Sequence, residues 1–179
     1  MTLEIQPLSD SNFDLWLNFY DGRALKNNPE WDGCYCQFYL NTESDEVSAK
    51  NRRDLACSRK ASGTMQGYVA IENNAVYGWM AAGPSNNYPK IPKGDPTTAR
   101  VVCFTIDPKR RGQGIATSLL KFGIDDLRMR GFKKVEARGV PEGKADPTNY
   151  PGPISLYEKH GFSVAQVFDD GYSLMELHL

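Results

Sequence analysis

Three basic side chains and two glycines lie together in the stretch Lys109-Arg-Arg-Gly-Gln-Gly114, where a strand is expected to give way to a helix. Glycines at a helix start leave backbone N–H groups unshielded. Those groups lack intrahelical acceptors and carry the positive end of the helix dipole. Lys109, Arg110 and Arg111 add full positive charges. The pattern therefore predicts an anion site, and phosphate is the anion that suits it best.

The spacing of these residues excludes two common phosphate loops. A Walker loop needs Gly-Lys followed by Ser or Thr, and no such run of the required pattern occurs in the chain. The dinucleotide fingerprint would require a glycine at position 117, where the chain has Thr117. The pattern that fits is Arg111-x-x-Gly114-x-Ala116, with the hydrophobic Ile106 five positions before the arginine. Alone, it is also compatible with a glycine-rich start of an ordinary surface helix.

This pattern closely resembles the acyl-CoA pyrophosphate loop of the GNAT acetyltransferase superfamily. A second motif, Leu156-Tyr-Glu-Lys-His-Gly-Phe162, resembles the Tyr-x-x-x-Gly-Phe signature of the same superfamily. The gap between loop and signature is normal for the family. With the order of elements given below, the resemblance covers residues 64–179 well and the N-terminal part by topology only.

The elements that must position these motifs follow from periodicity and from turn residues. Alternating or uncharged β-branched runs predict strands at 3–7, 65–71, 75–82, 101–106, 133–138, 164–168 and 172–177. Helical spacing predicts helices capped by Ser9 or Asp10, over 44–62, from 115 to about 127, and over 154–160. The fold class expected is α/β (α+β mixed). It is the GNAT fold, a mixed, mostly antiparallel sheet of about seven strands flanked by about four helices, in one domain over 1–179.

Composition narrows the location and the partners. A net charge of −1 gives no general attraction to nucleic acid or to anionic lipid. The N-terminus shows no signal-peptide pattern and no apolar run approaches the ~18 residues that span a bilayer. We therefore expect a cytoplasmic protein with no nucleic-acid and no membrane partner. Cys34 and Cys36 have one spacer, too few for the usual zinc pair, so reduced thiols and no metal are expected.

The resemblance implies that acetyl-CoA is the cofactor. Main-chain groups of Phe104, Thr105 and Ile106 would pair with its pantetheine arm beside a splayed strand, and one N–H group would polarise the thioester carbonyl. The pyrophosphate loop would comprise Arg110, Arg111, Gly112, Gln113, Gly114, Ile115, Ala116 and Thr117. Many family members carry an asparagine seven residues before the signature tyrosine. Here that position is Tyr150, so either Asn149 serves in a loop of shifted register or the contact is absent.

The resemblance also implies catalytic roles. Tyr157 takes the place of the general acid that protonates the departing thiolate, although a helix tyrosine can equally pack on the sheet. Glu136 and Glu72 are candidate bases for the acceptor amine, and both also fit as solvated strand residues. Glu30, Trp31 and Tyr35 could bind a cationic acceptor, or form a surface loop folded on its own aromatic residues.

The expected function is an N-acetyltransferase, in which a primary amine of a small molecule or peptide directly attacks the thioester of acetyl-CoA. The alternative is a GNAT-fold protein that binds acyl-CoA as a sensor without turnover. The acceptor, the acyl-chain preference and the oligomeric state stay undecided, and a homodimer is compatible with the sequence.

Overall fold

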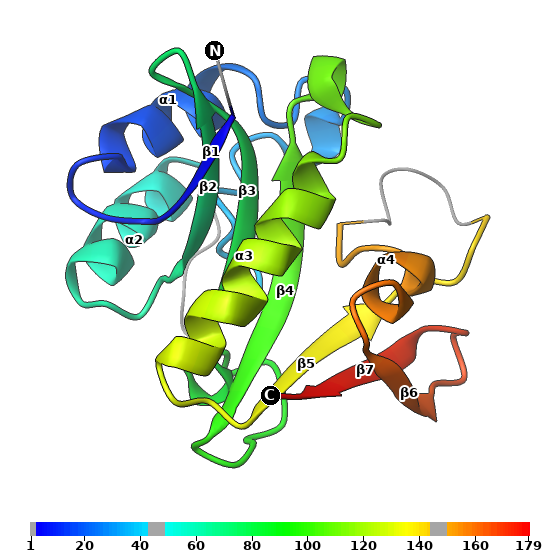
Figure 1. The fold of residues 1–179 in the computed structure, drawn as a ribbon. Coiled ribbons are helices and arrows are strands. Elements are labelled where there is room, and N and C mark those ends of the chain that lie inside the picture. The colour runs from blue at the N-terminus through cyan, green and yellow to red at the C-terminus, as the bar shows by residue number, and fades with distance from the viewer. Residues whose placement is uncertain (1–2, 43–48, 144–149) are drawn as a thin grey trace.

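The computed structural model describes residues 3–42, 49–143 and 150–179, which contain a seven-stranded sheet in the order β1-β2-β3-β4-β5-β7-β6 (Figure 1). The strands are β1 (Glu4–Pro7), β2 (Gly67–Glu72), β3 (Ala75–Pro84), β4 (Thr98–Ile106), β5 (Lys134–Gly139), β6 (Ser163–Val167) and β7 (Ser173–His178). Within this sheet only β4 and β5 run parallel. The mixed, mostly antiparallel sheet predicted from the sequence is confirmed.

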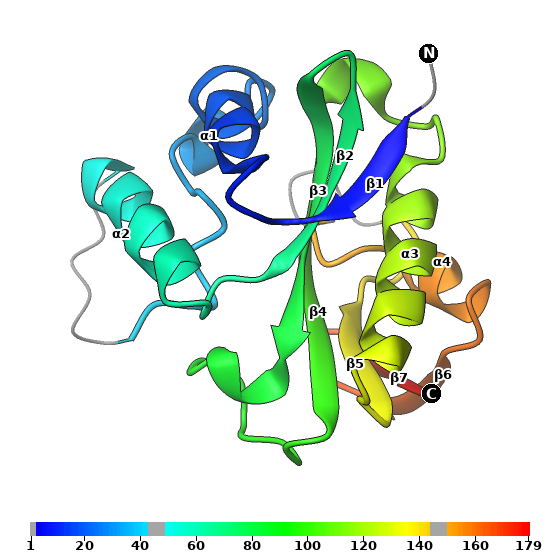
Figure 2. The same ribbon diagram turned by 60° about the vertical axis from the view of Figure 1, so that its left-hand side comes forward.

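Four helices cover the two faces of the sheet: α1 (Phe13–Gly22), α2 (Ala49–Ala61), α3 (Ile115–Met129) and α4 (Ile154–Glu158). Figure 2 shows α1 and α2 on one face and α3 and α4 on the other. The prediction that Ser9 or Asp10 caps the first helix is wrong. That helix starts after Asn12, whose side-chain oxygen accepts the Ser9 N–H at 2.9 Å, so these residues form a turn before it. Within the described residues no helix is both long and apolar enough to cross a bilayer.

Alternation along β3 divides the core into two parts. Trp79 packs with Trp16 and Tyr20 of α1, and its neighbour Met80 packs under Leu120 of α3 on the other face. Each of these large apolar side chains contributes roughly 1.5–3 kcal/mol when fully buried. The α3 face is mostly aliphatic, whereas the α1 face contains a larger share of aromatic rings, and this difference continues into the functional site.

A β-bulge in β4 changes which side chains face α1. Ala81 of β3 lies opposite Cys103, but Ala82 lies opposite Val101, so Val102 is an extra residue. Because of this residue, Val102 and Cys103 both belong to the α1 face, whereas regular alternation would place them on opposite faces. The bulge therefore brings the Cys103 thiol to the side of the aromatic residues.

The strands β4 and β5 separate after a short paired region. They pair only from Thr98 with Lys134 to Val101 with Ala137. Beyond that point β4 continues to Ile106 paired with β3 only, and β4 and β5 diverge towards the top of Figure 1. The Asp107 N–H donates to the Tyr77 carbonyl at 2.9 Å, so by alternation the main-chain groups of Phe104 and Ile106 point to the open side.

Candidate active site

A cavity of about 650 Å³ lies where β4 separates from β5. One wall, which we call the strand wall, consists of Cys103, Phe104, Thr105, Ile106, Arg111 and Ala116. The facing wall, which we call the aromatic wall, consists of Trp31, Phe38, Tyr39 and Tyr150. The cavity therefore joins the end of a sheet strand and the start of α3 to residues from distant parts of the chain.

The segment from Tyr150 to Ile154 fills part of the gap between β4 and β5. The Phe104 N–H donates to the Tyr150 carbonyl at 2.7 Å. On the other side the Val140 N–H donates to the Gly152 carbonyl, and the Ile154 N–H donates to the Val140 carbonyl, each at 2.9 Å. The segment thus bridges the two diverging strands. The main chain of Phe104 faces the opening, as the resemblance implied, but its N–H group already has an acceptor.

The loop before α3 has the geometry that its glycines predicted. Gly112 and Gly114 have φ angles of 73° and 78°, a left-handed conformation that favours glycine, and a Cβ at either position would meet nothing within 4 Å. The first helical hydrogen bond runs from the Ser118 N–H to the Gly114 carbonyl at 3.0 Å. The N–H groups of residues 115–117 therefore have no acceptor within the helix. Open space and outward N–H groups fit a pyrophosphate.

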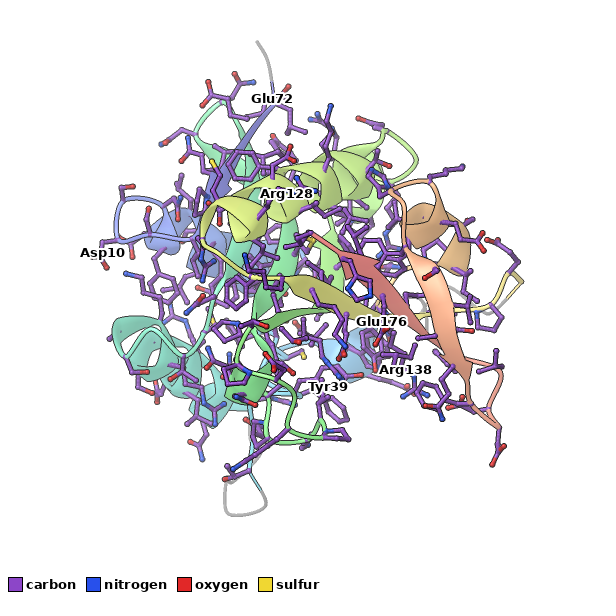
Figure 3. All side chains as sticks on the ribbon, turned by 60° about the horizontal axis from the view of Figure 1, so that its bottom comes forward. Asp10, Tyr39, Glu72, Arg128, Arg138 and Glu176 are labelled. Atoms are coloured by element: carbon purple, nitrogen blue, oxygen red, sulfur yellow. The ribbon has the colours of Figure 1, made fainter. Side chains whose placement is uncertain are left out.

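The two predicted loop arginines have different surroundings. Arg111 lines the cavity, where its guanidinium donates to the Asn27 side-chain oxygen at 3.2 Å. Arg110 points elsewhere and forms an ion pair with Glu72 at 2.8 Å. The hydrogen bond from Arg110 lowers the pKa of Glu72. Figure 3 shows Glu72 at the far end of the molecule from the cavity residue Tyr39. Gln113 accepts a hydrogen bond from Arg110 at 2.9 Å, and thus supports the loop from its exposed side.

Three further residues of the predicted loop lie in the first turn of α3 and differ in exposure. Ala116 lines the cavity, Ile115 is buried in the core, and Thr117 is exposed. The side chain of Thr117 is not among those that line the cavity. Asn149 lies outside the described residues. Its neighbour Tyr150, which occupies the position of the family asparagine, is part of the aromatic wall.

Tyr157 is fully buried and lies directly behind the cavity wall. Its hydroxyl donates to the Pro151 carbonyl, and its ring packs against Phe162 with centroids 5.2 Å apart. Gly152 separates it from the cavity, because a Cβ added at Gly152 would lie 3.3 Å from the Tyr157 hydroxyl oxygen. Burial raises the pKa of Tyr157, so the phenol holds its proton at neutral pH. Both readings of this residue, packing and proton donation, fit this position.

Glu136 is buried in the paired part of β5 and lies outside the cavity wall. Its two carboxylate oxygens form ion pairs with Arg100 of β4 and with Lys134, the latter at 2.6 Å. Burial alone would raise the pKa of Glu136, but Lys134 and Arg100 outweigh it and the pKa is lowered. In this arrangement Glu136 ties β4 to β5 at the base of the strand opening.

The aromatic wall is a set of rings in edge contact. The rings of Trp31 and Tyr150 lie 5.1 Å apart at 74°, and the hydroxyls of Tyr39 and Tyr150 share a hydrogen bond of 3.1 Å. At the mouth, the Lys90 ammonium lies 4.2 Å from the centre of the Phe38 ring. Glu30 also lines the cavity, as expected for an acceptor residue.

Tyr35 supports the aromatic wall and is not among the residues that line the cavity. Its hydroxyl donates to Asp21 at 2.5 Å, and its ring stacks on Tyr20 at 5.6 Å. Burial and the bond to Asp21 raise the pKa of Tyr35 to about 12. Tyr35 and Cys36 have φ angles of 44° and 55°, which cost roughly 1–3 kcal/mol each for residues other than glycine.

Three thiols line the floor between the two walls: Cys34, Cys36 and Cys103. The hydrogen bond from Cys103 lowers the pKa of Cys36 despite burial, and Cys103 lies 3.7 Å from the Thr105 hydroxyl. Across the described residues no group of three or more His, Cys, Asp or Glu side chains could hold a metal ion. The sequence does not predict that Cys103 meets Cys34 and Cys36 in one cavity, because this meeting depends on the bulge in β4.

Several cavity residues carry no signal in the sequence that identifies them. Arg52 and Lys90 belong to a charged helix and to a proline-rich loop, where basic residues are usually solvated. Tyr39 and Tyr150 meet although 111 positions separate them. Only an alignment of relatives or the fold itself could have placed these residues together.

Comparisons with known proteins agree with this architecture. The model of the acetyltransferase (GNAT) family matches residues 28–162. The fold is similar to that of the N-acetyltransferase from Staphylococcus aureus Mu50, with a TM-score of 0.62 at 18% identity over 99% of both chains. It is also similar to the PaiA N-acetyltransferase of Thermoplasma acidophilum in complex with coenzyme A, with a TM-score of 0.62 at 15% identity over 100% of both chains.

A third similar structure is the ribosomal-protein-alanine N-acetyltransferase of Brucella melitensis, with a TM-score of 0.61 at 20% identity over 99% of this chain and 100% of that one. No curated protein sequence matches the chain. The family match covers the pyrophosphate loop, the separated strands and the tyrosine signature, so it includes every part of the strand wall. The chain belongs to the acetyltransferase (GNAT) family and is an acyltransferase whose cofactor is acetyl-CoA.

Proposed function

We propose that this enzyme transfers an acetyl group from acetyl-CoA to a primary amine of a small molecule or peptide, by direct attack of the amine on the thioester. The observation that carries the proposal is that one cavity contains both walls. Its strand wall provides main-chain groups and a helix start for a phosphorylated ligand. Its aromatic wall provides apolar side chains that an organic acceptor could contact.

The residues of the strand wall would hold the cofactor, which supplies an activated acetyl thioester when bound. The N–H groups from Gly112 to Ala116 and the Arg111 guanidinium provide the positive potential that a pyrophosphate requires. The Phe104 N–H faces the opening and would stabilise negative charge on an acyl oxygen. For this role, the Tyr150 carbonyl must release the hydrogen bond that it accepts in the present structure.

Tyr157 is the proposed general acid. Its hydroxyl lies behind Gly152, which has no Cβ to cover it, and burial keeps the phenol protonated. A rotation of the hydroxyl away from the Pro151 carbonyl would present this proton to a sulfur leaving group. This role is supported by the position of the phenol, which Gly152 separates from the cavity.

An acceptor amine must be neutral to attack, and an alkylamine has a pKa of ~10.4, so it must lose a proton in the site. Glu136 and Glu72 were predicted as bases, and either would have to act through water because neither lines the cavity. Glu30 lies in the cavity wall itself. Its carboxylate would attract the cationic form of the amine before the proton is lost.

The test is to mix purified protein with acetyl-CoA and a panel of primary amines, and to follow release of free thiol. We expect the rate of thiol release to saturate as the concentration of one amine rises. Mass spectrometry should then identify the N-acetylated product. Binding of acetyl-CoA without thiol release for any amine would favour the alternative, an acyl-CoA sensor. Failure to bind coenzyme A at all would overturn the assignment of the strand wall.

A further inference from the structure

The cavity is cationic at the end away from the pyrophosphate loop. Besides Arg111, its charged lining residues are Arg52 of α2, Lys90 of the loop before β4, and Glu30. Glu30 supplies one negative charge, whereas Arg52 and Lys90 supply two positive charges. A site for a plain alkylamine would gain nothing from this excess, because the protonated amine would be repelled.

Arg52 differs from the other basic side chains described on its helix. Arg53 forms an ion pair with Asp21 at 3.1 Å, Arg59 donates to Gln37 and Asn41 at 2.7 Å each, and Lys60 pairs with Asp10. The Arg52 Nε is buried, and no residue in the described part of the chain accepts a hydrogen bond from it. A buried donor of this kind destabilises the folded state unless a ligand supplies the acceptor.

The position of Arg52 also connects it to the reacting end of the cavity. Cys34 and Cys36 line the same cavity as Arg52, and Cys103 of β4 lines it as well. The rings of Trp31 and Tyr39 belong to the same lining. A ligand lying along this lining would have one end at β4 and the other at Arg52.

We propose that the acceptor is a small amino acid in the broad sense, with an amine at one end, an apolar body, and a carboxylate bound by Arg52. Lys90 at the mouth adds to the same positive potential. The inference rests on the proposed function, since it names the acceptor of that acetyl transfer. The amine nitrogen forms a bond to the acetyl carbon while the carbon–sulfur bond breaks, and one amine proton is lost. The products are an N-acetylated acid and coenzyme A as its thiol.

The test compares acceptors in pairs that differ only in the carboxylate: phenylalanine with phenethylamine, and 4-(aminomethyl)benzoate with benzylamine. The first acid has its two groups close together and the second has them at opposite ends of a ring. We expect the wild-type enzyme to favour at least one acid over its partner. Arg52→Gln should lower kcat/KM for that acid about 10- to 100-fold, mainly through KM, and leave the partner amine unchanged.

The matched control is Arg128→Gln on α3, where Arg128 pairs with Asp125 at 3.0 Å on the opposite face of the sheet. Lys90→Gln should have a smaller effect in the same direction, since Lys90 is exposed. Equal use of acids and amines by the wild type, or an equal loss on both by Arg52→Gln with the fold intact, would overturn the proposal.

A binding measurement separates this inference from the proposed function. If acetyl-CoA binds but no amine is acetylated, calorimetry with 4-(acetamidomethyl)benzoate still tests the carboxylate site. Binding to the wild type that weakens at least 10-fold in Arg52→Gln, but not in Arg128→Gln, would support the site although the transferase proposal had failed. No binding of this acid to the wild type, while amines are acetylated, would overturn the site alone. No binding in a protein that acetylates nothing overturns both.

Discussion

The two walls of the cavity are built by different means. The strand wall lies within one short stretch, from Cys103 to Ala116, and includes the start of α3, where N–H groups have no acceptor within the helix. The aromatic wall gathers side chains from three separate segments, around Trp31, around Tyr39 and at Tyr150. A wall of main-chain groups tolerates many side-chain changes but is sensitive to backbone conformation. A wall of side chains responds in the opposite way, and each prediction below tests one side of this difference.

The largest effect is expected for Gly114→Val. A β-branched side chain is strained at a φ of 78° and would stand in the open space over the N–H groups of the first turn. We expect the Kd for coenzyme A to rise about 100-fold, as when two charge-assisted hydrogen bonds are lost, measured by calorimetry.

The control is Gly131→Val, at the other end of α3. Gly131 has a φ of 89° and also has nothing within 4 Å of an added Cβ. It should lose a similar amount of stability in thermal unfolding but bind coenzyme A normally. Equal losses of coenzyme A affinity in the two variants would contradict the special role of the α3 start.

Tyr157→Phe should lower kcat about 10-fold and leave the Kd for coenzyme A unchanged, because only the proton donor is removed. The matched control is Tyr68→Phe, which removes another buried phenol, one that donates to Asp126 at 2.7 Å on the α3 face. If both variants unfold at lower temperature and both retain full turnover, Tyr157 is a packing residue.

Trp31→Ala should raise the KM for the acceptor about 5-fold, as expected for the loss of one aromatic contact, and leave coenzyme A binding unchanged. Phe122→Ala is the control, because Phe122 packs edge-on against Tyr68 with centroids 5.7 Å apart, away from the cavity. A rise in the Kd for coenzyme A in Trp31→Ala alone would show that the two walls are not independent.

The smallest effect on activity is expected for Glu136→Gln, which lies outside both walls. The pKa of Glu136 is lowered in the folded state, so its ion pairs stabilise the protein above the unfolded value of ~4.3 and are lost as the pH falls below it. Glu136→Gln should lower stability at pH 7 by about 1–3 kcal/mol and reduce the further loss between pH 5 and 3. Turnover should change less than about 2-fold; a fall of about 10-fold with intact fold would identify Glu136 as the base.

Interactions that are local in sequence made the strand wall predictable. A left-handed glycine before a helix, unpaired N–H groups in its first turn and adjacent arginines all act within a few residues. The sequence therefore predicts an anion site at Arg111, Gly112 and Gly114 without knowledge of the rest of the fold. The turn between β2 and β3 is also local, since Asn73 and Asn74 have φ angles of 50° and 58°, which asparagine tolerates. Helix ends were less certain, as Asn12 shows, since several neighbouring residues can form the turn before a helix.

The sequence by itself thus determined the family and the seven-stranded sheet, and it predicted the glycine-rich loop before α3, because these depend on periodicity and on local backbone geometry. Only the tertiary structure decided that the Phe104 N–H meets the Tyr150 carbonyl, that Glu136 and Glu72 are held in ion pairs, and that Arg52 faces the cavity. The physical reason is that burial and pairing are set by contacts between residues far apart in the chain. A one-residue bulge at Val102 was enough to bring Cys103 to the α1 face and into the cavity lining.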